Sequence, residues 1–542
     1  MRFDNAFLLR LAAFAAAALL LVATLDVARH SFRVDGETYR ILNDDVMIGL
    51  RAARNLALGH GPYFNPGERV AAVTSLSWPN LLAPLFGIFS AERAILAATT
   101  LSIALTLGIF ALIAATARTA IAAMLALALM ATSRSLVEYA PSAWEHIPQA
   151  LFATAGLLAI LGRIPAFGRY GLEAGLLLLA AAFLFRVDTA PMLTIPAACF
   201  LWRLVRAPRL ANCALLAVLA AVPAAQLLLH QAIYGDIVPN TYHLKVGGEA
   251  AGVADGLAYL ATNVVVGGNA ALVLALAALT LPAWRTLTAS ERIVLGACAA
   301  QVVYIVAIGG DVFSHGRFFL VIQPIVTLLL AERLVAAAAA MPRRAGHDAT
   351  ASLAAMLVAA TLVAATYHDT ARSDGHRPLY GAGPALGLEP EAVRSQVALA
   401  PVIRAHIRPE DGQVGLFWLG ALSYYLPEFA AADFLGKADP VIARTPVHWG
   451  PVGHNKWDFA WSLRERHVAV VPFPPPLDPA EARRIVESRR GIGAFAAFQL
   501  DPAVAAGYTY LSAARLGQNH GWGLYVRNDL VGRFAPETGR QR

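Results

Sequence analysis

Residues 94–116 read AILAATTLSIALTLGIFALIAAT, a run of 23 residues without a charged side chain. At 1.5 Å per residue such a helix is about 35 Å long, which is enough to cross a hydrocarbon core of about 30 Å. Within lipid the segment has to be helical, because every backbone N–H must find its partner inside the segment. The stretch therefore predicts a helix that spans a membrane.

The composition of the whole chain agrees with this prediction. Of 542 residues, 58% are hydrophobic and only 15% are charged, whereas a soluble domain carries about 25% charged residues. A disordered chain and a purely soluble protein are thereby excluded. Similar apolar runs recur, and we predict about eleven spans: 6–27, 94–116, 119–133, 148–162, 171–186, 189–203, 210–230, 268–283, 291–308, 317–335 and 350–367.

The first of these runs is long for a secretion signal. Residues 6–25 are apolar apart from Arg10, whereas a cleaved signal has a shorter apolar region and a small-residue cleavage site. We therefore predict a first transmembrane helix with its N-terminus in the cytoplasm. Arginines in the later predicted cytoplasmic loops support this orientation. The net charge of +7 is interpreted as topology and lipid contact, with no nucleic-acid partner.

The character of the chain changes after residue 367. We predict a membrane domain, 1–367, with a first outer loop at 28–93, followed by a soluble α/β domain, 368–542, on the same outer side. The second domain is rich in Pro and Gly, with β-like runs at 468–471 and 523–526 and a helical pattern at 478–489. The three cysteines lie in apolar segments and predict neither a disulfide framework nor a zinc site.

The first outer loop contains a short amphipathic helix that begins near Asn43. Apolar residues recur there at helical spacing, and Asp44, Arg51 and Asn55 share one face. In one interpretation Asn43 or Asp44 caps the helix and the arginines meet lipid headgroups. In the other, Asp44 and Asp45 form a paired-carboxylate site in which one acts as a base and the other orients it.

Four further polar clusters are predicted on the same outer face. They are Glu138 with Trp144-Glu145-His146, Arg186 with Asp188, the turn-rich loop 234–245, and 309–317. Each has a simpler alternative: an interfacial anchor for Trp144, an ion pair that closes a helical hairpin for Arg186 and Asp188, a generic loop, and a snorkelling Arg317. Arg317 would otherwise hold a phosphate, for which its planar fork is suited.

No nucleotide-binding, zinc-protease or serine-hydrolase motif stands where its mechanism would need it. Any energy must therefore come from an ion gradient or from an activated lipid-linked substrate.

Several stretches resemble the GT-C arabinofuranosyltransferases, above all the terminal β-(1→2)-arabinofuranosyltransferase family. They run in order through most of the chain: DDVMI (44–48), RNLALGHG (54–61), FNPGERV (64–70), YGD (234–236) with PNTY (239–242) through Lys245, GGD (309–311) with GRF (316–318), DFLG (433–436), DP (439–440), IAR (442–444) and GHNK (453–456). The resemblance implies a multispan GT-C enzyme of the bacterial cytoplasmic (inner) membrane. Such an enzyme moves a sugar, typically arabinofuranose, from a polyprenyl monophosphate donor to an extracytoplasmic glycan or glycoprotein.

The chemistry of glycosyl transfer then suggests roles for the charged residues. Asp44 is expected to be the base or charge stabiliser, with Asp45 orienting it, although the sequence leaves open which of the two is the base. Cations would neutralise the donor phosphate: Arg317, Lys245, Arg54, His243 and His315. Other polar residues would bind sugar or acceptor, or hold those cations in place: Glu145, Asp188, Asn240, Asp311 and His454. No cofactor and no metal site is predicted, and a divalent cation stays open.

A membrane transporter or flippase for a lipid-linked sugar is the alternative function. It should place its charges near mid-membrane in broken helices, ideally with an inverted repeat. In this chain the charges gather at the predicted outer ends of spans, and no repeat is detected. A binding scaffold without chemistry would leave the Asp44, Asp45 and Arg317 set without a joint purpose.

Overall fold

The apolar runs rich in Ala and Leu form helices, since these residues have high helix propensity and no polar side chain that competes for the backbone. The computed structural model describes residues 31–34, 36–208, 210–245, 252–265, 269–311, 313–340, 389–450, 452–489, 493–518 and 521–534. The chain divides into two units. We call residues 1–28, 96–227 and 251–379 the helical unit, and residues 29–95, 228–250 and 380–542 the sheet unit.

The described part of the helical unit consists of helices joined by turns. Its elements are α4 (Ala91–Thr116), α5 (Ala120–Ala131), α6 (Arg134–Tyr139), η1 (Ala140–Ser142), α7 (His146–Ile160), η2 (Pro165–Tyr170), α8 (Gly171–Phe185), η3 (Val187–Thr189), α9 (Ala190–Arg206), α10 (Leu210–Tyr234), α12 (Val253–Val265), α13 (Asn269–Thr280), η4 (Trp284–Thr286), α14 (Ala289–Ala307), η5 (Ser314–Phe319) and α15 (Gln323–Ala340). The first turn of α4 and the end of α10 are counted with the sheet unit.

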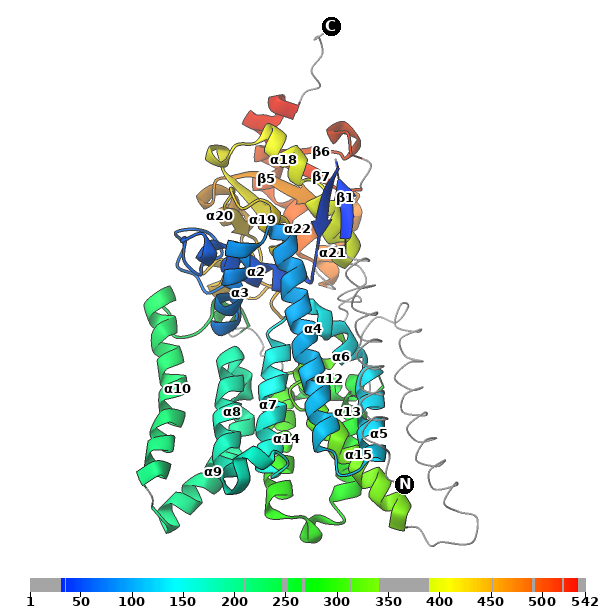
Figure 1. Ribbon diagram of the computed structural model, residues 1–542. Helices are drawn as coiled ribbons and strands as arrows, with labels where there is room; N and C mark the ends of the chain where they lie inside the picture. The colour runs from blue at the N-terminus through cyan, green and yellow to red at the C-terminus, as the bar shows by residue number, and fades with distance from the viewer. Residues whose placement is uncertain are drawn as a thin grey trace. The chain divides into compact units, whose positions relative to one another are not determined.

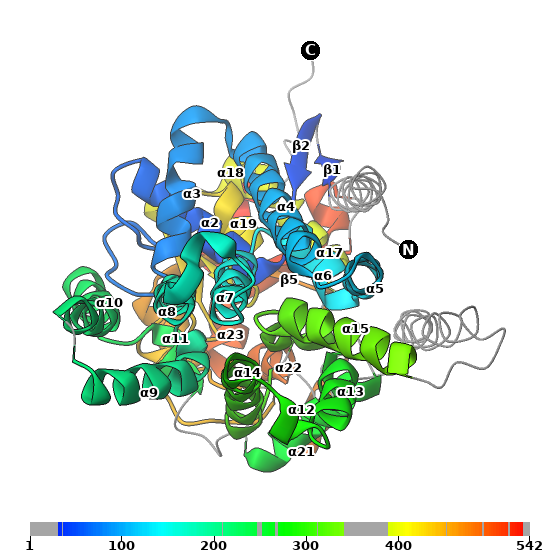
Figure 2. The ribbon, with the colours of Figure 1, turned by 60° about the horizontal axis from the view of Figure 1, so that its bottom comes forward.

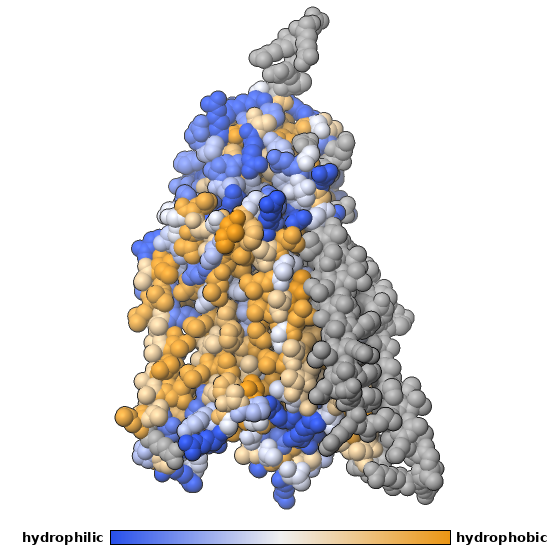
Figure 3. Space-filling model, in the orientation of Figure 1, coloured by the Kyte–Doolittle hydropathy of each residue, from blue (hydrophilic) through white to orange (hydrophobic). Residues whose placement is uncertain are grey.

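These helices pack along their lengths (Figures 1 and 2). α8 packs against α7 and α9, α14 packs against α9, and α15 packs against α5 and α13. Glycines let α7 and α8 approach closely, since a Cβ on Gly156 would lie 2.9 Å from the carbonyl oxygen of Gly175. The face seen in Figure 3 is apolar along these helices, and large exposed hydrophobic side chains include Leu101, Leu177 and Val218. Such a surface is suited to lipid.

Four described helices are long and apolar enough to cross a membrane: α4, a segment formed by η2 and α8, α10 and α14. Counting each of two bent helix pairs as one span raises the number to six. The predicted spans 6–27 and 350–367 lie outside the described residues. The predicted total of eleven therefore stays a prediction, while the multispan helical character is confirmed.

The sheet unit combines the first loop with the C-terminal part of the chain. Its elements are β1 (Ser31–Val34), β2 (Glu37–Arg40), α2 (Asp44–Ala57), α3 (Ser77–Ile88), α11 (Asn240–Lys245), α17 (Glu389–Val397), α18 (Ala400–His406), η6 (Pro409–Asp411), β3 (Gln413–Leu416), α19 (Gly420–Tyr425), β4 (Ala431–Asp433), η7 (Ile442–Arg444), α20 (Phe459–Glu465), β5 (Val468–Phe473), α21 (Pro479–Ser488), α22 (Ala494–Leu500), α23 (Pro502–Gly507), β6 (Tyr508–Leu511), η8 (Ala514–Leu516), β7 (Gly523–Arg527) and η9 (Asn528–Phe534).

Five strands form a mixed sheet in the order β4-β3-β5-β7-β6. β4, β3 and β5 are parallel, while β7 runs antiparallel to both β5 and β6, with Val470 opposite Val526. Every residue of β5 is buried, as expected for a central strand that is covered on both faces. An aromatic core that includes Phe417, Phe434 and Phe498 packs against this sheet.

The predicted α/β part is thus present, and β5, β7 and α21 lie where the pattern placed them. The predicted domain boundary at 367 falls outside the described residues and stays a prediction. In the structure, residues 29–95 and 228–250 belong to the same unit as the C-terminal part.

A buried arginine fastens the first loop to the C-terminal part of the sheet unit. Arg51 of α2 is 1% exposed, so the lipid-headgroup alternative is wrong for it. Its Nε donates to the carbonyl of Phe64 at 2.8 Å, and its Nη2 donates to the carbonyl of Phe429 at 2.8 Å. Its Nη1 donates to the carbonyl of Ser423. One guanidinium therefore joins α2 to the segment that follows α19.

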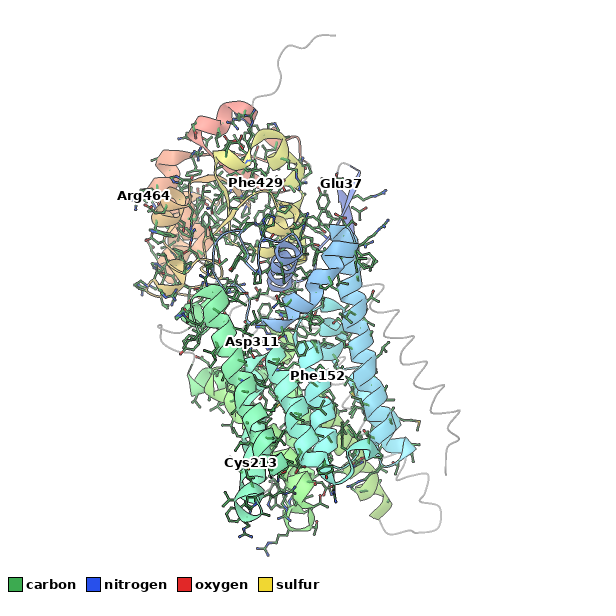
Figure 4. All side chains as sticks on the ribbon, turned by 60° about the vertical axis from the view of Figure 1, so that its left-hand side comes forward. Glu37, Phe152, Cys213, Asp311, Phe429 and Arg464 are labelled. Carbon is green, nitrogen blue, oxygen red and sulfur yellow. The ribbon has the colours of Figure 1, made fainter. Side chains whose placement is uncertain are left out.

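We predict that Arg51→Lys lowers the apparent Tm of the purified protein by several degrees. An ammonium on a flexible stem cannot reproduce the planar fork, so buried carbonyls lose their donors at a cost of about 1–3 kcal/mol each. Arg464→Lys is the matched control, because that side chain on α20 is 75% exposed and is labelled in Figure 4. The Tm values are measured by scanning fluorimetry. Equal values for both variants and wild type would contradict the role of Arg51 in joining α2 to the C-terminal part of the sheet unit.

Candidate functional site

Asp44 and Asp45 begin the same helix but lie in different environments. Asn43 is the N-cap of α2, and its side chain accepts the N–H of Asp45 at 3.0 Å. Asp44 is 3% exposed, and its Oδ1 accepts the N–H groups of Gly420 and Ala421 at 2.8 and 3.0 Å. Asp44 therefore caps the start of α19. Burial raises the pKa of the Asp44 carboxyl, although Lys437 and the two amide donors partly oppose this.

A glycine makes this contact possible. A Cβ on Gly420 would lie 1.9 Å from the backbone oxygen of Asp44, so any other residue there would push α19 away from α2. Two segments that are 376 residues apart in sequence meet here backbone against backbone.

Asp45 instead pairs with Lys437. The ammonium donates to Asp45 Oδ1, and the two side chains keep 16% (Lys437) and 25% (Asp45) of their surface exposed. Burial alone would lower the pKa of Lys437, but Asp45 and Asp44 raise it above its ordinary value. Of the two carboxylates, Asp45 is thus the more accessible to solvent.

The loop that carries Lys437 is held from inside by Asp433 at the end of β4. The Asp433 carboxylate accepts the N–H of Leu435 at 2.9 Å and the N–H of Ala438 at 2.6 Å. Gly436 lies at φ +85, in the left-handed region that favours glycine. Burial raises the pKa of Asp433 to about 6. The backbone on both sides of Lys437 is therefore fixed.

Asn240 holds the same loop from α11. Its buried amide Nδ2 donates to the carbonyls of Gly436, Lys437 and Asp439 at 2.8, 3.1 and 3.2 Å. The amide was predicted to bind sugar or acceptor. Its observed contacts are with the Lys437 loop.

His454 lies within electrostatic range of two lysines, Lys437 and Lys245. The pKa of His454 is lowered to about 4, first by burial and then by Lys437, with a smaller contribution from Lys245. His454 Nδ1 is buried without a hydrogen-bond partner. Lys245 is exposed at the end of α11. Asp45, Lys437, His454 and Lys245 thus form one mixed polar cluster in the sheet unit.

The other predicted phosphate ligands of this unit are engaged with protein groups. Arg54 donates to the carbonyl of Tyr424 at 3.1 Å and lies over its ring. His243 pairs with Asp236 at 2.7 Å, and Asp236 also accepts Arg444 at 3.0 Å. Another predicted phosphate ligand, His315, belongs to the helical unit, and its side chain lies outside the part of the chain that the structure describes.

The remaining predicted residues form a second cluster, within the helical unit. Arg186 donates to Glu145 at 2.8 Å and to Asp188 at 2.7 Å, and Gln149 also donates to Asp188 at 2.6 Å. Since α7 carries Gln149 and η3 carries Asp188, these bonds join two helical segments. The simpler alternative, an ion pair at a helical turn, describes part of this arrangement.

Arg317 belongs to the same cluster and is 5% exposed. It pairs with Asp311, Nη2 to Oδ1 at 2.9 Å, and its guanidinium lies over Trp144 and Phe313 at 4.6 and 4.0 Å from the ring centroids. Phe318 lies beside both guanidiniums, that of Arg186 and that of Arg317. Asp311 is labelled in Figure 4. Each guanidinium therefore already has carboxylate partners.

Among the described residues, no three His, Cys, Asp or Glu side chains are arranged to hold a metal ion. The chemistry that these residues can perform by themselves is that of carboxylates, ammonium groups and guanidiniums.

The comparisons identify similar proteins. No family model matches the chain. It is 35% identical over 141 residues to the terminal β-(1→2)-arabinofuranosyltransferase of Mycobacterium tuberculosis, and 54% identical over 43 residues to that of Corynebacterium glutamicum. These matches cover 26% and 8% of this chain, but only 19% and 6% of the relatives. The resemblance predicted from the motifs is confirmed within those segments.

The structure of ArnT from Cupriavidus metallidurans in the apo state matches with a TM-score of 0.55 at 14% identity, covering 97% of this chain and 99% of that one. The same protein bound to undecaprenyl phosphate gives 0.52, also at 14% identity, covering 95% and 97%. The chain has the GT-C fold. This likeness concerns the fold, and the predicted membrane nature of the protein is confirmed by it.

Sequence reasoning missed Lys437 as a site residue, although it quoted the residues on both sides of it. The signal was available: a single Lys lies between Asp433 and Asp439 in a Gly-containing turn. Arg186 was named with Asp188 as a polar cluster, but it was given no role of its own in the predicted site.

We predict that His454→Gln changes how stability depends on pH. Because the folded state resists protonation of His454, wild type loses stability as pH falls from about 6.5 toward about 4. The raised pKa of Asp433 acts oppositely, with stability lost as pH rises through about 6, but it is common to both proteins. As the pH falls from about 7 to about 5, the Tm of the variant should therefore rise relative to the Tm of wild type.

His60→Gln, at an exposed loop position, is the control and should follow wild type at each pH. A constant Tm difference between His454→Gln and wild type across this range would contradict a buried neutral imidazole.

Proposed function

We propose that this protein is a membrane glycosyltransferase of GT-C type. It transfers a sugar from a polyprenyl monophosphate to an extracytoplasmic glycan or glycoprotein. The names of its relatives favour arabinofuranose as this sugar. The observation that carries the proposal is the Asp45–Lys437 pair, an accessible carboxylate beside an ammonium. Two similarities support it: relatives named as arabinofuranosyltransferases, and a shared fold with ArnT, a protein that was solved with undecaprenyl phosphate.

The reaction has simple requirements. The bond between the anomeric carbon and the phosphate oxygen breaks, and its electron pair leaves with the phosphate. The acceptor oxygen bonds to the anomeric carbon, and its proton passes to a carboxylate base. Positive charge that develops on the sugar is stabilised by nearby carboxylates.

Asp45 is the better candidate for the base. A base must come within hydrogen-bond distance of the acceptor hydroxyl, and the Asp45 side chain is 25% exposed. Asp44 is 3% exposed and already accepts two amide N–H groups. We therefore assign proton transfer to Asp45, and to Asp44 the positioning of α2 against α19.

The donor phosphate needs cations that it can reach. In the sheet unit, Lys245 is exposed, and the Lys437 side chain is 16% exposed on the flexible four-carbon stem that every lysine has. In the helical unit, Arg317 remains a candidate through its Nη1, since Nε and Nη2 are bonded to Asp311. Glu145, Asp188 and Asp311 then serve to hold the guanidiniums in place.

We predict that Asp45→Asn lowers the rate of transfer from synthetic polyprenyl-phospho-arabinose by roughly 10²-fold or more, because an amide cannot accept the proton. Asp44→Asn is the matched control. Its amide oxygen can still accept the N–H groups of Gly420 and Ala421, so it should retain more activity. Asp45→Asn with normal turnover would remove Asp45 from this role.

The assay runs in detergent, where a transporter has no membrane to act across. Transfer of label to an acceptor would therefore favour the enzyme over the transporter. Labelled lipid that moves across sealed vesicles without transfer would favour the transporter.

We also predict that the sheet unit faces the outside of the cytoplasmic membrane. Arg464→Cys, introduced after removal of Cys199, Cys213 and Cys298, should react with a membrane-impermeant maleimide in intact spheroplasts. Arg169→Cys is the matched control, since Arg169 is exposed in η2 and lies in a predicted cytoplasmic loop. It should react only after permeabilisation, and the reverse pattern would contradict the orientation.

A further inference from the structure

Lysine is rare in this chain, and its few positions are clustered. Of 43 basic residues only three are lysines: Lys245, Lys437 and Lys456. All three belong to the sheet unit. Lys245 ends α11, Lys437 lies in the loop that α11 holds, and Lys456 donates to the carbonyl of His243 on α11 at 2.9 Å. The three ammonium-bearing residues thus share one neighbourhood in a protein that otherwise uses arginine.

The backbone of this neighbourhood is fixed on several sides. Lys456 also donates to the carbonyl of Ala443 at 2.8 Å, which ties α11 to η7. Asn240 and Asp433 bind the loop on both sides of Lys437. With its Cα held in this way, Lys437 keeps freedom only in its side chain.

The groups around the Lys437 ammonium are mainly acidic. Asp45 is in direct contact, and Asp44 and Asp433 lie close enough to act on its charge. The ammonium in turn acts on His454. Lys245, at the end of α11, also acts on the charge of His454. An anion that enters would meet an ammonium that is already paired with the proposed base.

We infer that Lys437 carries an ammonium that moves from Asp45 to the donor phosphate, so that this ion pair opens only when the lipid phosphate is bound. This inference rests on the proposed function. While the ion pair is intact, an oxygen of Asp45 is occupied and its negative charge is compensated. When the ammonium turns to the phosphate, Asp45 is left to accept the proton of the acceptor hydroxyl.

The charges balance through the step. The donor phosphodiester carries one negative charge, and the released phosphate gains a second as it takes the bonding electron pair. Lys437 compensates this gain, and Asp45 becomes neutral as it takes the proton. A lysine is suited to this exchange, because its compact charge rotates on a flexible stem, whereas the planar fork of arginine would favour a fixed bidentate pair.

The movement of Lys437 between Asp45 and the phosphate, called the switch below, predicts how substitutions change the affinity for the lipid phosphate. If phosphate and Asp45 compete for one ammonium, removal of the Asp45 charge should strengthen binding of undecaprenyl phosphate. We expect Asp45→Asn to bind it roughly 3- to 10-fold more tightly than wild type, and Lys437→Gln to bind it at least as much more weakly. Lys437→Arg should recover binding but only part of the turnover.

The double variant Asp45→Asn/Lys437→Gln completes a thermodynamic cycle. Because Asp45 acts on the phosphate through Lys437, the double variant should bind like Lys437→Gln alone. Glu465→Gln, which removes an acid from an exposed pair on α20, controls for a general change in charge and should bind like wild type.

The experiment uses the full chain in nanodiscs of zwitterionic lipid, with undecaprenyl phosphate as the probe and affinity as the readout. Tighter binding by Asp45→Asn that disappears in the double variant supports the switch. Equal or weaker binding by Asp45→Asn, while wild type binds, overturns it and leaves the proposed function standing. If wild type does not bind the probe, the proposed donor class itself fails.

Discussion

The buried guanidinium of Arg51 is the contact on which the sheet unit depends. A charge removed from water is costly unless its donors are satisfied. Here the partners are mainly backbone carbonyls, from Phe64 of the same loop and from the segment that contains Ser423 and Phe429. Burial lowers the pKa of Arg51 to about 9, which still leaves it protonated near neutral pH. Breaking the contact would leave a buried charge and buried carbonyls without partners. The position of α2, and with it of Asp44 and Asp45, is therefore fixed by polar bonds as well as by apolar packing.

The two adjacent carboxylates show how two successive residues of a helix come to lie in different environments. Successive residues of a helix point about 100° apart, so Asp44 faces α19 while Asp45 faces the Lys437 loop. The same side chain acquires a different environment and a different task at each position, as in sites where neighbouring acids have distinct roles. Asp44 acts as the cap of a second helix, and this contact in turn fixes the direction in which Asp45 projects.

Much of the fold was predictable because it follows from periodicity. The amphipathic helix at 44–57, the long apolar helices and the strands at 468–473 and 523–527 each show a local pattern. The candidate site was predictable only in part. Asp45, Lys245 and His454 were named, but their grouping around Lys437 depends on contacts between segments as much as 392 residues apart. Asn240 was assigned to ligand because a buried amide and a ligand-binding amide look the same in sequence. Whether Arg317 takes part in the same chemistry stays a prediction.

The choice between arginine and lysine connects these observations. Most of the charges that the structure holds in place are guanidiniums: Arg51 on carbonyls, Arg186 on two carboxylates, Arg317 on one carboxylate and three rings. Arg163 also binds Glu332 through both of its terminal nitrogens. Lys456, which donates to two carbonyls, is an exception. Each such guanidinium contact uses several donors in fixed geometry and loses much when any acceptor moves. At Asp45 the partner is instead one of three lysines, on a rigid loop but a flexible stem. A charge that must change partners during a reaction is served better by such a group than by a fork, and this difference in side-chain physics is the main reason to place the chemistry at Asp45 and Lys437.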